Sequence, residues 1–314
     1  MLSNQIATSN IKMKTYQQLW QSLTPLYDAG EAQAIVRTVL DVEYGMTLTD
    51  IICGKVNEIS ADEERKLEEI IIRLQKGEPV QYVLGEADFA GRPFHVEPGV
   101  LIPRPETAEL CQWIEKDMIE KSIVSSGDSS EDSSGNSPQA TDDARRILDI
   151  CTGSGCIAIT LGLNIPNSEV TGWDISEDAL RIAQGNVEML KARNVRIEYQ
   201  DALALPKAAE AADLIVSNPP YICEKEKADM EKNVLEHEPS LALFVPDEDP
   251  LKFYRAIAEY ASSTLKPEGA LYFEINPIYE KETREMLLKL DFKDIETKED
   301  AFGKKRMMRA KSTK

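Results

Sequence analysis

The sequence predicts an α/β fold, with a mostly parallel β-sheet covered by helices on both faces and a small helical bundle ahead of it. Two observations support this prediction. After residue 143, short apolar runs alternate with segments whose apolar residues recur every three or four positions. This alternation is typical of β-α-β units. Residues 16–76 show only the helical spacing, so we expect a separate bundle there.

The bundle is expected to contain helices within 16–27, 31–45 and 62–77. Gly45 and Gly77 stand where helices are expected to stop. After the bundle, large apolar residues flank Gly91, which predicts a hairpin, and several prolines then stiffen a linker. The predicted domains are therefore 1–84 (helical), 85–105 (hairpin and linker) and 106–314 (main domain).

A helix is expected over 107–121, followed by a segment of different composition. Residues 122–143 are dominated by Ser, Gly and acids. Such a segment cannot bury enough apolar surface to offset its chain entropy, so we predict a disordered insertion. The expected strands of the main domain are Ile147–Cys151, Val170–Asp174, Val195–Tyr199, Leu214–Ser217 and Ala270–Ile275, with an end hairpin near Phe292–Ile295 and Arg306–Ala310.

The bulk composition argues against several classes of protein. The net charge of −19 disfavours binding along a phosphate backbone. The one dense basic run, "KKRMMRAKSTK" at the end, is interpreted as charges on an edge strand. No apolar run reaches the roughly 18–20 residues of a membrane span, and no secretory signal is recognisable. Five cysteines without a CxxC pair, and only two histidines, favour a reduced cytoplasmic chain without a metal centre.

The stretch "ILDICTGSGCIAIT" predicts a buried strand, a glycine turn and the start of a helix. Gly153 and Gly155 let the backbone approach a ligand closely. Asp174 ends the second strand, where an acid suits ribose hydroxyls; the alternative is a solvated acid at a strand end. Because the turn is not Gly-x-Gly-x-x-Gly and no Lys follows it, a nucleoside ligand without phosphates fits best.

The third strand leads to Asp201 and Ala202, at the position where such folds meet an adenine. Asp201 suits this role and suits the N-cap of a helix equally well. The two interpretations of this residue both stay open.

The fourth strand ends in Asn218-Pro219-Pro220-Tyr221, because neither proline has an N–H for a strand ladder. The side-chain oxygen of Asn218 and the backbone carbonyl of Pro219 can accept the two hydrogens of one planar NH₂ group. The lone pair of such a nitrogen is delocalised. Holding it by both hydrogens aims it at an electrophile, while Tyr221 packs on the plane. The alternative is that "NPPY" forms only a turn.

These motifs resemble a known family. "NPPY" together with "LDICTGSG" is similar to the S-adenosylmethionine-dependent amino-methyltransferases. "PVQYVLGEADFAGRPFHVEPGVLIPRPET" and "EHEPSLALF" are similar to the HemK/PrmC family, the protein-(glutamine-N5) methyltransferases of release factors. The resemblance implies a Rossmann-like class I methyltransferase domain with a seven-stranded sheet. It also implies that the N-terminal helical domain recognises the release factor and that S-adenosylhomocysteine is the product.

The resemblance also implies roles for individual residues. The implied methyl-donor site consists of Cys151, Thr152, Gly153, Ser154, Gly155, Asp174, Asp201, Ala202 and Asn218. The implied substrate site consists of Asn218, Pro219, Pro220, Tyr221 and Arg104, of which Asn218, Pro219 and Tyr221 are catalytic. No metal is implied.

Three positions depart from the family pattern. Cys151 stands where many members have Gly, and Ala202 where an aromatic residue often faces the adenine. Asn276 stands where Gly is common. Arg104 could line the cleft or pair with Glu106 to lock the linker, and we favour the cleft. His237 is interpreted as a packed loop residue rather than a general base.

The expected function is methyl transfer from S-adenosylmethionine to the glutamine amide in the Gly-Gly-Gln motif of class I peptide chain release factors. The alternatives are a glutamine of a ribosomal protein, an adenine in DNA, or cofactor binding without catalysis. A DNA enzyme would need a basic groove and a target-recognition region. We therefore expect no direct DNA binding, no membrane contact and a monomer.

Overall fold

The computed structural model describes residues 15–127, 144–207 and 211–314. The chain divides into two compact units, Met1–Gly85 and Glu86–Lys314. Each unit has its own apolar core. The core of the first unit is built from residues between Leu19 and Val83, and the two core clusters of the second unit lie entirely between Phe89 and Ala310. Each unit therefore buries its apolar residues against itself.

The first unit is all helical, as its spacing predicts. Side chains of Thr15, Asp28, Thr47 and Ser60 accept backbone N–H groups at the starts of four of its helices. Gly45, at φ 60°, ends the second. The elements are α1 (Tyr16–Gln21), α2 (Ala29–Tyr44), α3 (Leu48–Ile52), η1 (Lys55–Glu58), α4 (Ala61–Leu74) and α5 (Val80–Leu84).

Helix α1 is shorter than the sequence predicts. The predicted segment 16–27 continues past Gln21, where α1 ends. Pro25 has no N–H and disfavours helical geometry in the residue before it. The chain therefore passes through turns between α1 and α2.

The second unit contains a seven-stranded sheet with the order β10-β11-β9-β6-β3-β4-β5. The five adjacent strands β9, β6, β3, β4 and β5 are parallel to one another. Only β11 is antiparallel to its two neighbours, β10 and β9. The expected mostly parallel, seven-stranded sheet is confirmed. Its strands are β3 (Arg145–Ile150), β4 (Ser168–Asp174), β5 (Val195–Tyr199), β6 (Ala212–Ser217), β9 (Leu265–Glu274), β10 (Lys293–Glu299) and β11 (Lys305–Lys311).

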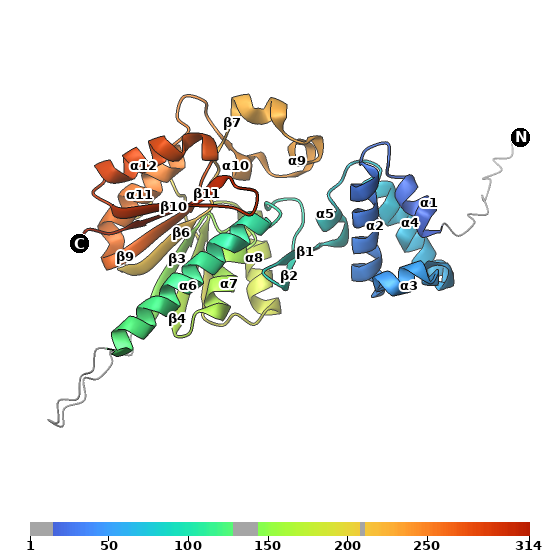
Figure 1. Cartoon of the computed structure of the whole chain (residues 1–314), viewed down its shortest axis with the longest axis horizontal. Helices are drawn as coiled ribbons and strands as arrows, with labels where there is room; N and C mark the ends of the chain where they lie inside the picture. The colour runs from blue at the N-terminus through green and yellow to red at the C-terminus, as the bar shows by residue number, and fades with distance from the viewer. Residues whose placement is uncertain (1–14, 128–143, 208–210) are drawn as a thin grey trace, which may run out of the picture. The chain divides into compact units, whose positions relative to one another are not determined.

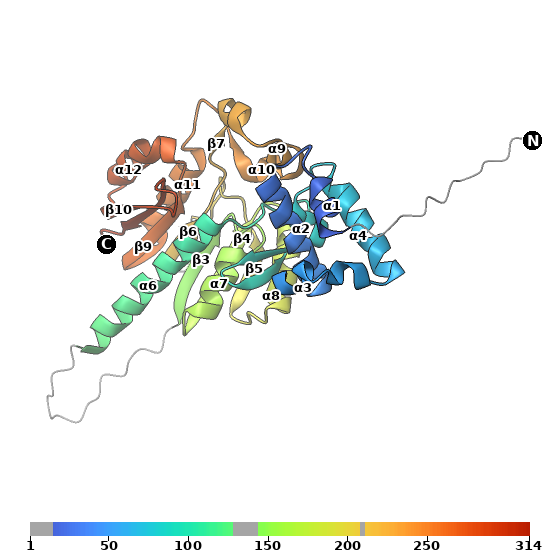
Figure 2. The same cartoon turned by 45° about the vertical axis from the view of Figure 1, so that its right-hand side comes forward.

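Helices cover both faces of this sheet (Figures 1 and 2). Side chains alternate between faces along a strand. In β9, Tyr272 faces the cluster of α6 (Pro105–Gly127), α7 (Cys156–Asn164) and α8 (Glu177–Met189). Its neighbour Phe273 faces α11 (Lys252–Thr264) and α12 (Glu280–Lys289). This two-sided burial explains why the strands are almost continuously apolar.

The hairpin predicted around Gly91 is formed by β1 (Glu86–Phe89) and β2 (Arg92–His95). Phe89 and Phe94 meet edge to face at 5.8 Å and belong to the core of the second unit. The remaining elements follow β6 or β9 in the chain. They are β7 (Ile222–Cys223), η2 (Glu224–Asp229), α9 (Lys232–His237), α10 (Ser240–Leu243), β8 (Phe244–Val245) and η3 (Pro277–Tyr279).

Two expectations need correction. Helix α6 continues to Gly127, so residues 122–127 are helical rather than disordered. The rest of the predicted insertion, 128–143, lies outside the described residues. The basic C-terminal run is not on an edge strand, because β11 lies between β10 and β9. Its cations pair with acids, as in Arg306–Asp300 and Arg309–Asp117.

Over the described ranges, no helix has the length and apolar character needed to cross a membrane.

Candidate active site

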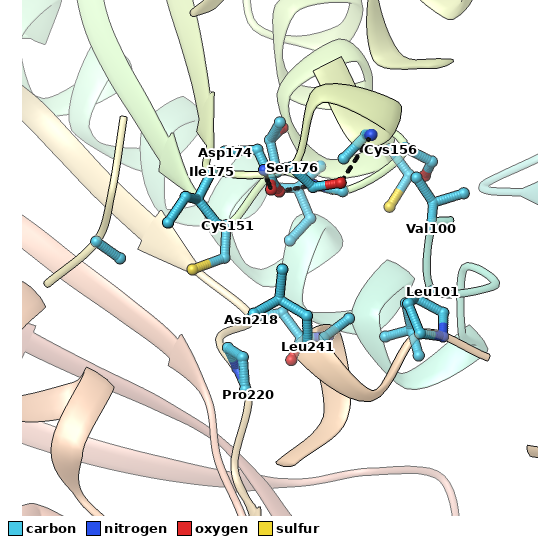
Figure 3. A pocket seen from close by; sticks show the side chains of 18 of the residues that line it. Val100, Leu101, Cys151, Cys156, Asp174, Ile175, Ser176, Asn218, Pro220 and Leu241 are labelled. Carbon is cyan, nitrogen blue, oxygen red and sulfur yellow. Dashed lines mark hydrogen bonds between the residues drawn. The ribbon is translucent and has the colours of Figure 1, made fainter. Parts of the chain in front are cut away.

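The candidate site lies at the carboxyl ends of the parallel strands, where ligands bind in open α/β sheets. A pocket there joins the glycine turn after β3, Asp174 at the end of β4, the segment after β5 and Asn218 after β6. Figure 3 shows Asp174 and Ser176 on one side of this pocket and Asn218 and Leu241 on the facing side. The predicted site residues that line it are Arg104, Cys151, Thr152, Gly153, Ser154, Asp174, Asp201, Ala202, Asn218 and Pro220.

Three predicted site residues do not line this pocket. Tyr221 lines a second hollow beside it. Pro219 is buried in the turn. Gly155 begins α7 at φ 80°, and a Cβ there would come within 3.1–3.2 Å of Ile159 and Ala183. The absence of a side chain at Gly155 thus lets the start of α7 pack closely against Ala183 of α8. Gly153 and Ser154 line the pocket instead.

Asp174 is bound into the turn rather than free in solvent. Its carboxylate oxygens accept the N–H of Gly153 at 2.8 Å and the N–H of Ser176 at 2.9 Å. Burial raises the pKa of this carboxyl, and the backbone donors oppose the shift. Each oxygen keeps a further lone pair that can accept a hydroxyl from a ligand.

Cys151 begins the turn at φ 65°, in the left-handed region that favours glycine. Its neighbour across the sheet is Asn218, because β3 and β6 pair with Ile150 opposite Ser217. Burial raises the pKa of the Cys151 thiol well above its ordinary value. The side chain is therefore a neutral thiol that lines the pocket, rather than a nucleophile.

Asp149 supports the turn from within the core. Its Oδ2 accepts the hydroxyl of Thr152 at 2.5 Å and the N–H of Ala158 at 3.2 Å. Its Oδ1 is buried and has no hydrogen-bond partner among the described residues. Burial raises the pKa of Asp149 to about 7, so this carboxyl titrates near neutral pH.

Asn218 belongs to a chain of buried polar groups. Its Nδ2 donates to Thr107 Oγ1 at 3.3 Å, and the Thr107 hydroxyl donates to Glu274 Oε2 at 2.6 Å. The hydroxyl of Tyr221 donates to the other oxygen of Glu274 at 3.0 Å. Burial raises the pKa of Glu274, while Thr107, Tyr221 and the Arg306 guanidinium oppose the shift.

Thr107 and Glu274 are site residues that their local sequence does not predict. Thr107 lies in the segment "PRPET", which is part of the family resemblance, and Glu274 lies near the end of an expected strand. Nothing local in the sequence indicates that they meet Asn218, because 111 positions separate Thr107 from it.

Asn276, one of the departures from the family pattern, braces the end of the "NPPY" loop. Its buried side chain donates to the backbone carbonyl of Tyr221 at 3.1 Å and to the carboxylate of Glu226. Glu226 in turn accepts the N–H of Cys223 at 2.9 Å. The loop is thus held at Tyr221 by side-chain contacts that a glycine could not make.

Arg104 lines the pocket, and its ion-pair partner is Glu238 rather than Glu106. Glu238 is buried and also accepts the N–H of Ile102 at 3.1 Å. This carboxylate therefore ties the segment "LIPRPET" to the segment "EHEPSLALF". His237 is the last residue of α9 and lines neither hollow.

The second hollow adjoins the first and shares Leu101, Arg104, Asn218 and Ala242 with it. Tyr221 and Glu274 lie in its wall, together with the apolar side chains of Met230, Val234 and Leu243. Asn218 therefore stands at the junction of two hollows, one beside the glycine turn and one beside Tyr221.

Asp201 also lines the first hollow, and its interpretation as a helix N-cap is wrong, because the described residues that follow it, 202–207, form no helix. Its carboxylate instead accepts the N–H of Leu203 at 2.8 Å within a turn. Ala202 is buried in the same core cluster that Phe253 packs against, and Phe253 also lines the pocket. An aromatic ring, supplied by α11, is thus present in this hollow.

The fold and the site together define a class of protein. A family model described as "Methyltransferase domain" matches residues 141–300. Among solved structures, the hMettl16 catalytic domain in complex with the MAT2A 3′UTR hairpin 6 has a TM-score of 0.50 and 13% sequence identity. That match covers 81% of this chain and 82% of that one. The second unit is a class I S-adenosylmethionine-dependent methyltransferase domain.

Curated relatives define the family within this class. A release factor glutamine methyltransferase of Bacteroides thetaiotaomicron is 47% identical, over 92% of this chain and 96% of that protein. Proteins of the same description from Flavobacterium psychrophilum and Bacillus subtilis are 38% and 36% identical, over 95% and 94% of this chain and 98% and 96% of theirs. The family model "PrmC N-terminal domain" matches residues 22–85. The chain belongs to the release factor glutamine methyltransferase family.

Proposed function

We propose that this chain transfers a methyl group from S-adenosylmethionine to the side-chain amide nitrogen of the glutamine in the Gly-Gly-Gln motif of class I release factors. The observation that carries the proposal is the position of Asn218 at the junction of the two hollows. An amide held by Asn218 from the second hollow would face a methyl donor bound in the first. The relatives described as release factor glutamine methyltransferases support this reaction.

The first hollow suits the methyl donor. Asp174 keeps lone pairs for two ribose hydroxyls, and the glycine turn presents backbone close to the ligand. Phe253, beside Ala202, can pack on an adenine in place of the aromatic residue that the family often has in the turn. When bound, S-adenosylmethionine supplies an electrophilic methyl group on a positively charged sulfur.

The second hollow suits a glutamine side chain. The apolar side chains of Met230 and Val234 line the entry for its methylene groups. Asn218 Oδ1 and the carbonyl of Pro219 accept the two amide hydrogens, and Tyr221 packs on the amide plane. This arrangement aims the nitrogen at the methyl group and stabilises the positive charge that develops on it. The extra proton then passes to water.

An adenine amino group would satisfy the same two acceptors, so the alternative substrate is DNA. The net charge of −19 disfavours it. The basic residues of β11, the densest basic run of the chain, are paired with acids of the sheet and its helices. These observations favour the protein substrate.

The test uses the purified chain and labelled S-adenosylmethionine with three acceptors. These are a class I release factor, the same factor with its Gly-Gly-Gln glutamine replaced, and duplex DNA. Label on the native factor alone is the expected result. Label on DNA alone would show that "NPPY" binds an NH₂ group as proposed but that the proposed substrate is wrong. Label on both forms of the factor would place the methyl group on another residue.

A further inference from the structure

We propose that Thr107 and Glu274 are positioning residues that fix the amide of Asn218 with its oxygen, rather than its nitrogen, toward the acceptor substrate. This inference rests on the proposed function, because it concerns how the same site holds a substrate NH₂ group. It adds two residues that act through Asn218 without themselves being required to touch the reacting atoms.

The three side chains come from three separate elements. Thr107 lies in the first turn of α6, Glu274 ends β9 and Asn218 follows β6. Strands β6 and β9 pair with Ser217 opposite Phe273, so the next residue of each lies at the same end of the sheet. Thr107 and Glu274 are each only 2% exposed. Solvent therefore does not compete for their hydrogen bonds.

The direction of each hydrogen bond follows from the donors available. An ionised carboxylate only accepts, so Glu274 takes the hydroxyl protons of both Thr107 and Tyr221. Burial raises the pKa of Glu274, while the hydroxyl donors of Thr107 and Tyr221 and the guanidinium of Arg306 oppose this rise and favour the ionised form. Thr107 has then used its one proton. Toward Asn218 its oxygen can only accept, and it accepts from Nδ2.

This ordering removes an ambiguity that an asparagine otherwise has. The two ends of its amide group have nearly the same shape but opposite hydrogen-bonding character. With Nδ2 held by Thr107, Oδ1 occupies the other side of the amide and is available as an acceptor. If the Asn218 amide were reversed, its Nδ2 group would face the NH₂ hydrogens of the substrate. Only the carbonyl of Pro219 would then remain as an acceptor for them.

The first test compares Thr107→Val, which keeps the shape but removes the hydroxyl, with Thr107→Ser, which keeps the hydroxyl. Turnover of the release factor, the dissociation constant for S-adenosylmethionine and the melting temperature are measured on the full chain. We expect Thr107→Val to lower kcat about tenfold, the effect of roughly one hydrogen bond. Thr107→Ser should stay within about threefold, and cofactor affinity within about twofold.

The matched control is Thr283→Val. Thr283 is fully buried in α12 and donates to the backbone carbonyl of Tyr279, away from both hollows. It should lose stability without a specific loss of kcat. If Thr107→Val keeps the wild-type kcat while Asn218→Ala loses it, the proposed function stands and the present inference is wrong. The inference also fails if Thr107→Ser is as impaired as Thr107→Val.

A second measurement needs no substrate. The side-chain NH₂ signals of asparagine are observed by NMR in protein labelled with ¹⁵N at asparagine, and Asn218 is assigned by its absence in Asn218→Ala. In the wild type, exchange of its NH₂ hydrogens with water should be slowed by Thr107, and Thr107→Val should speed it at least threefold. Unchanged exchange would overturn the inference, even if the release factor proves not to be the substrate.

Discussion

A cysteine begins the glycine turn at a backbone angle that glycine adopts freely and other residues adopt at a cost. Cys151 has φ 65°, and such strain costs on the order of 1 kcal/mol. A β-branched side chain is worse still at this angle. The position is therefore sensitive to side-chain shape as well as to packing.

We predict that Cys151→Val lowers the free energy of unfolding by about 1–3 kcal/mol. Cys151→Gly should remain within about 1 kcal/mol of the wild type, since relief of strain offsets the greater freedom of the unfolded chain. Urea unfolding of the three proteins provides the measurement. Equal stability of the valine and glycine variants would contradict the strain at this residue.

Asp149 makes stability depend on pH in the direction opposite to most carboxyl groups. Its pKa is about 7 in the folded chain, against an ordinary value of 3.8. Between these values the unfolded carboxyl is ionised and the folded one keeps its proton. The contribution of Asp149 to the unfolding free energy is therefore complete below pH 4 and is lost as the pH rises toward 7.

We predict that Asp149→Asn becomes progressively more stable relative to the wild type between pH 4 and pH 8. The upper bound of this relative gain is about 4 kcal/mol, from roughly three pKa units. Unfolding free energies at several pH values measure it, with Asp62→Asn at an exposed carboxylate as the control. A constant difference between Asp149→Asn and wild type across this range would show that Asp149 does not titrate there.

At the scale of elements, the loop after β6 is held at both of its ends. Thr107 accepts a hydrogen bond from Asn218, and Asn276, after β9, donates to the backbone of Tyr221 and to the side chain of Glu226. The rigidity of the two prolines is thus combined with anchors from distant segments. The loop that presents the acceptor is positioned by its neighbours as well as by its own sequence.

We predict that Asn276→Ala lowers the free energy of unfolding by about 1–3 kcal/mol, because the partly buried acceptors on Tyr221 and Glu226 lose their donor. Turnover should fall several-fold with cofactor affinity largely kept, since the first hollow does not include Asn276. Asn57→Ala, which removes one exposed bond to the carbonyl of Gly54, is the control for stability. Unchanged turnover would show that the prolines alone hold the loop.

Element boundaries show where local patterns stop being informative. Four of the five parallel strands lie within two residues of their predicted bounds, because buried parallel strands are continuous apolar runs. The fifth, β9, begins at Leu265, five residues before its predicted start, because its first residues, "LKPEG", are mostly polar or turn-forming. Residues 122–127 were predicted to be disordered from their composition. They are helical in the structure because they extend α6, whose earlier turns pack on the core, and adding a residue to an existing helix is far easier than starting one.

At the scale of the whole molecule, the two units have separate cores. Among the residues that the structure describes, no core cluster combines residues from both sides of Gly85. We therefore predict that a fragment comprising residues 86–314 folds and binds S-adenosylmethionine with an affinity within about threefold of the full chain. Calorimetric titration measures this. Loss of cofactor binding would show that the second unit depends on the first.

The same fragment should methylate the release factor with kcat/KM reduced at least tenfold, if the N-terminal unit recognises the factor as the family resemblance implies. Activity on a short Gly-Gly-Gln peptide should change much less, because the reacting groups all lie in the second unit. Equal loss on peptide and factor would indicate damage to the site rather than loss of recognition.

The sequence by itself determined the class of fold, the glycine turn, the acid at the end of β4 and the "NPPY" loop, because each is a local pattern of residues in one strand and its turn. It could not determine which partners those residues meet. The contacts of Thr107 with Asn218 and Glu274, of Tyr221 with Glu274, of Arg104 with Glu238 and of Asn276 with Tyr221 each span 53 to 167 positions of chain. Those contacts depend on strand order and register, and on the packing of α6 against the sheet. Local spacing cannot reveal them, since the free energy that selects one strand order comes from the burial of the whole core.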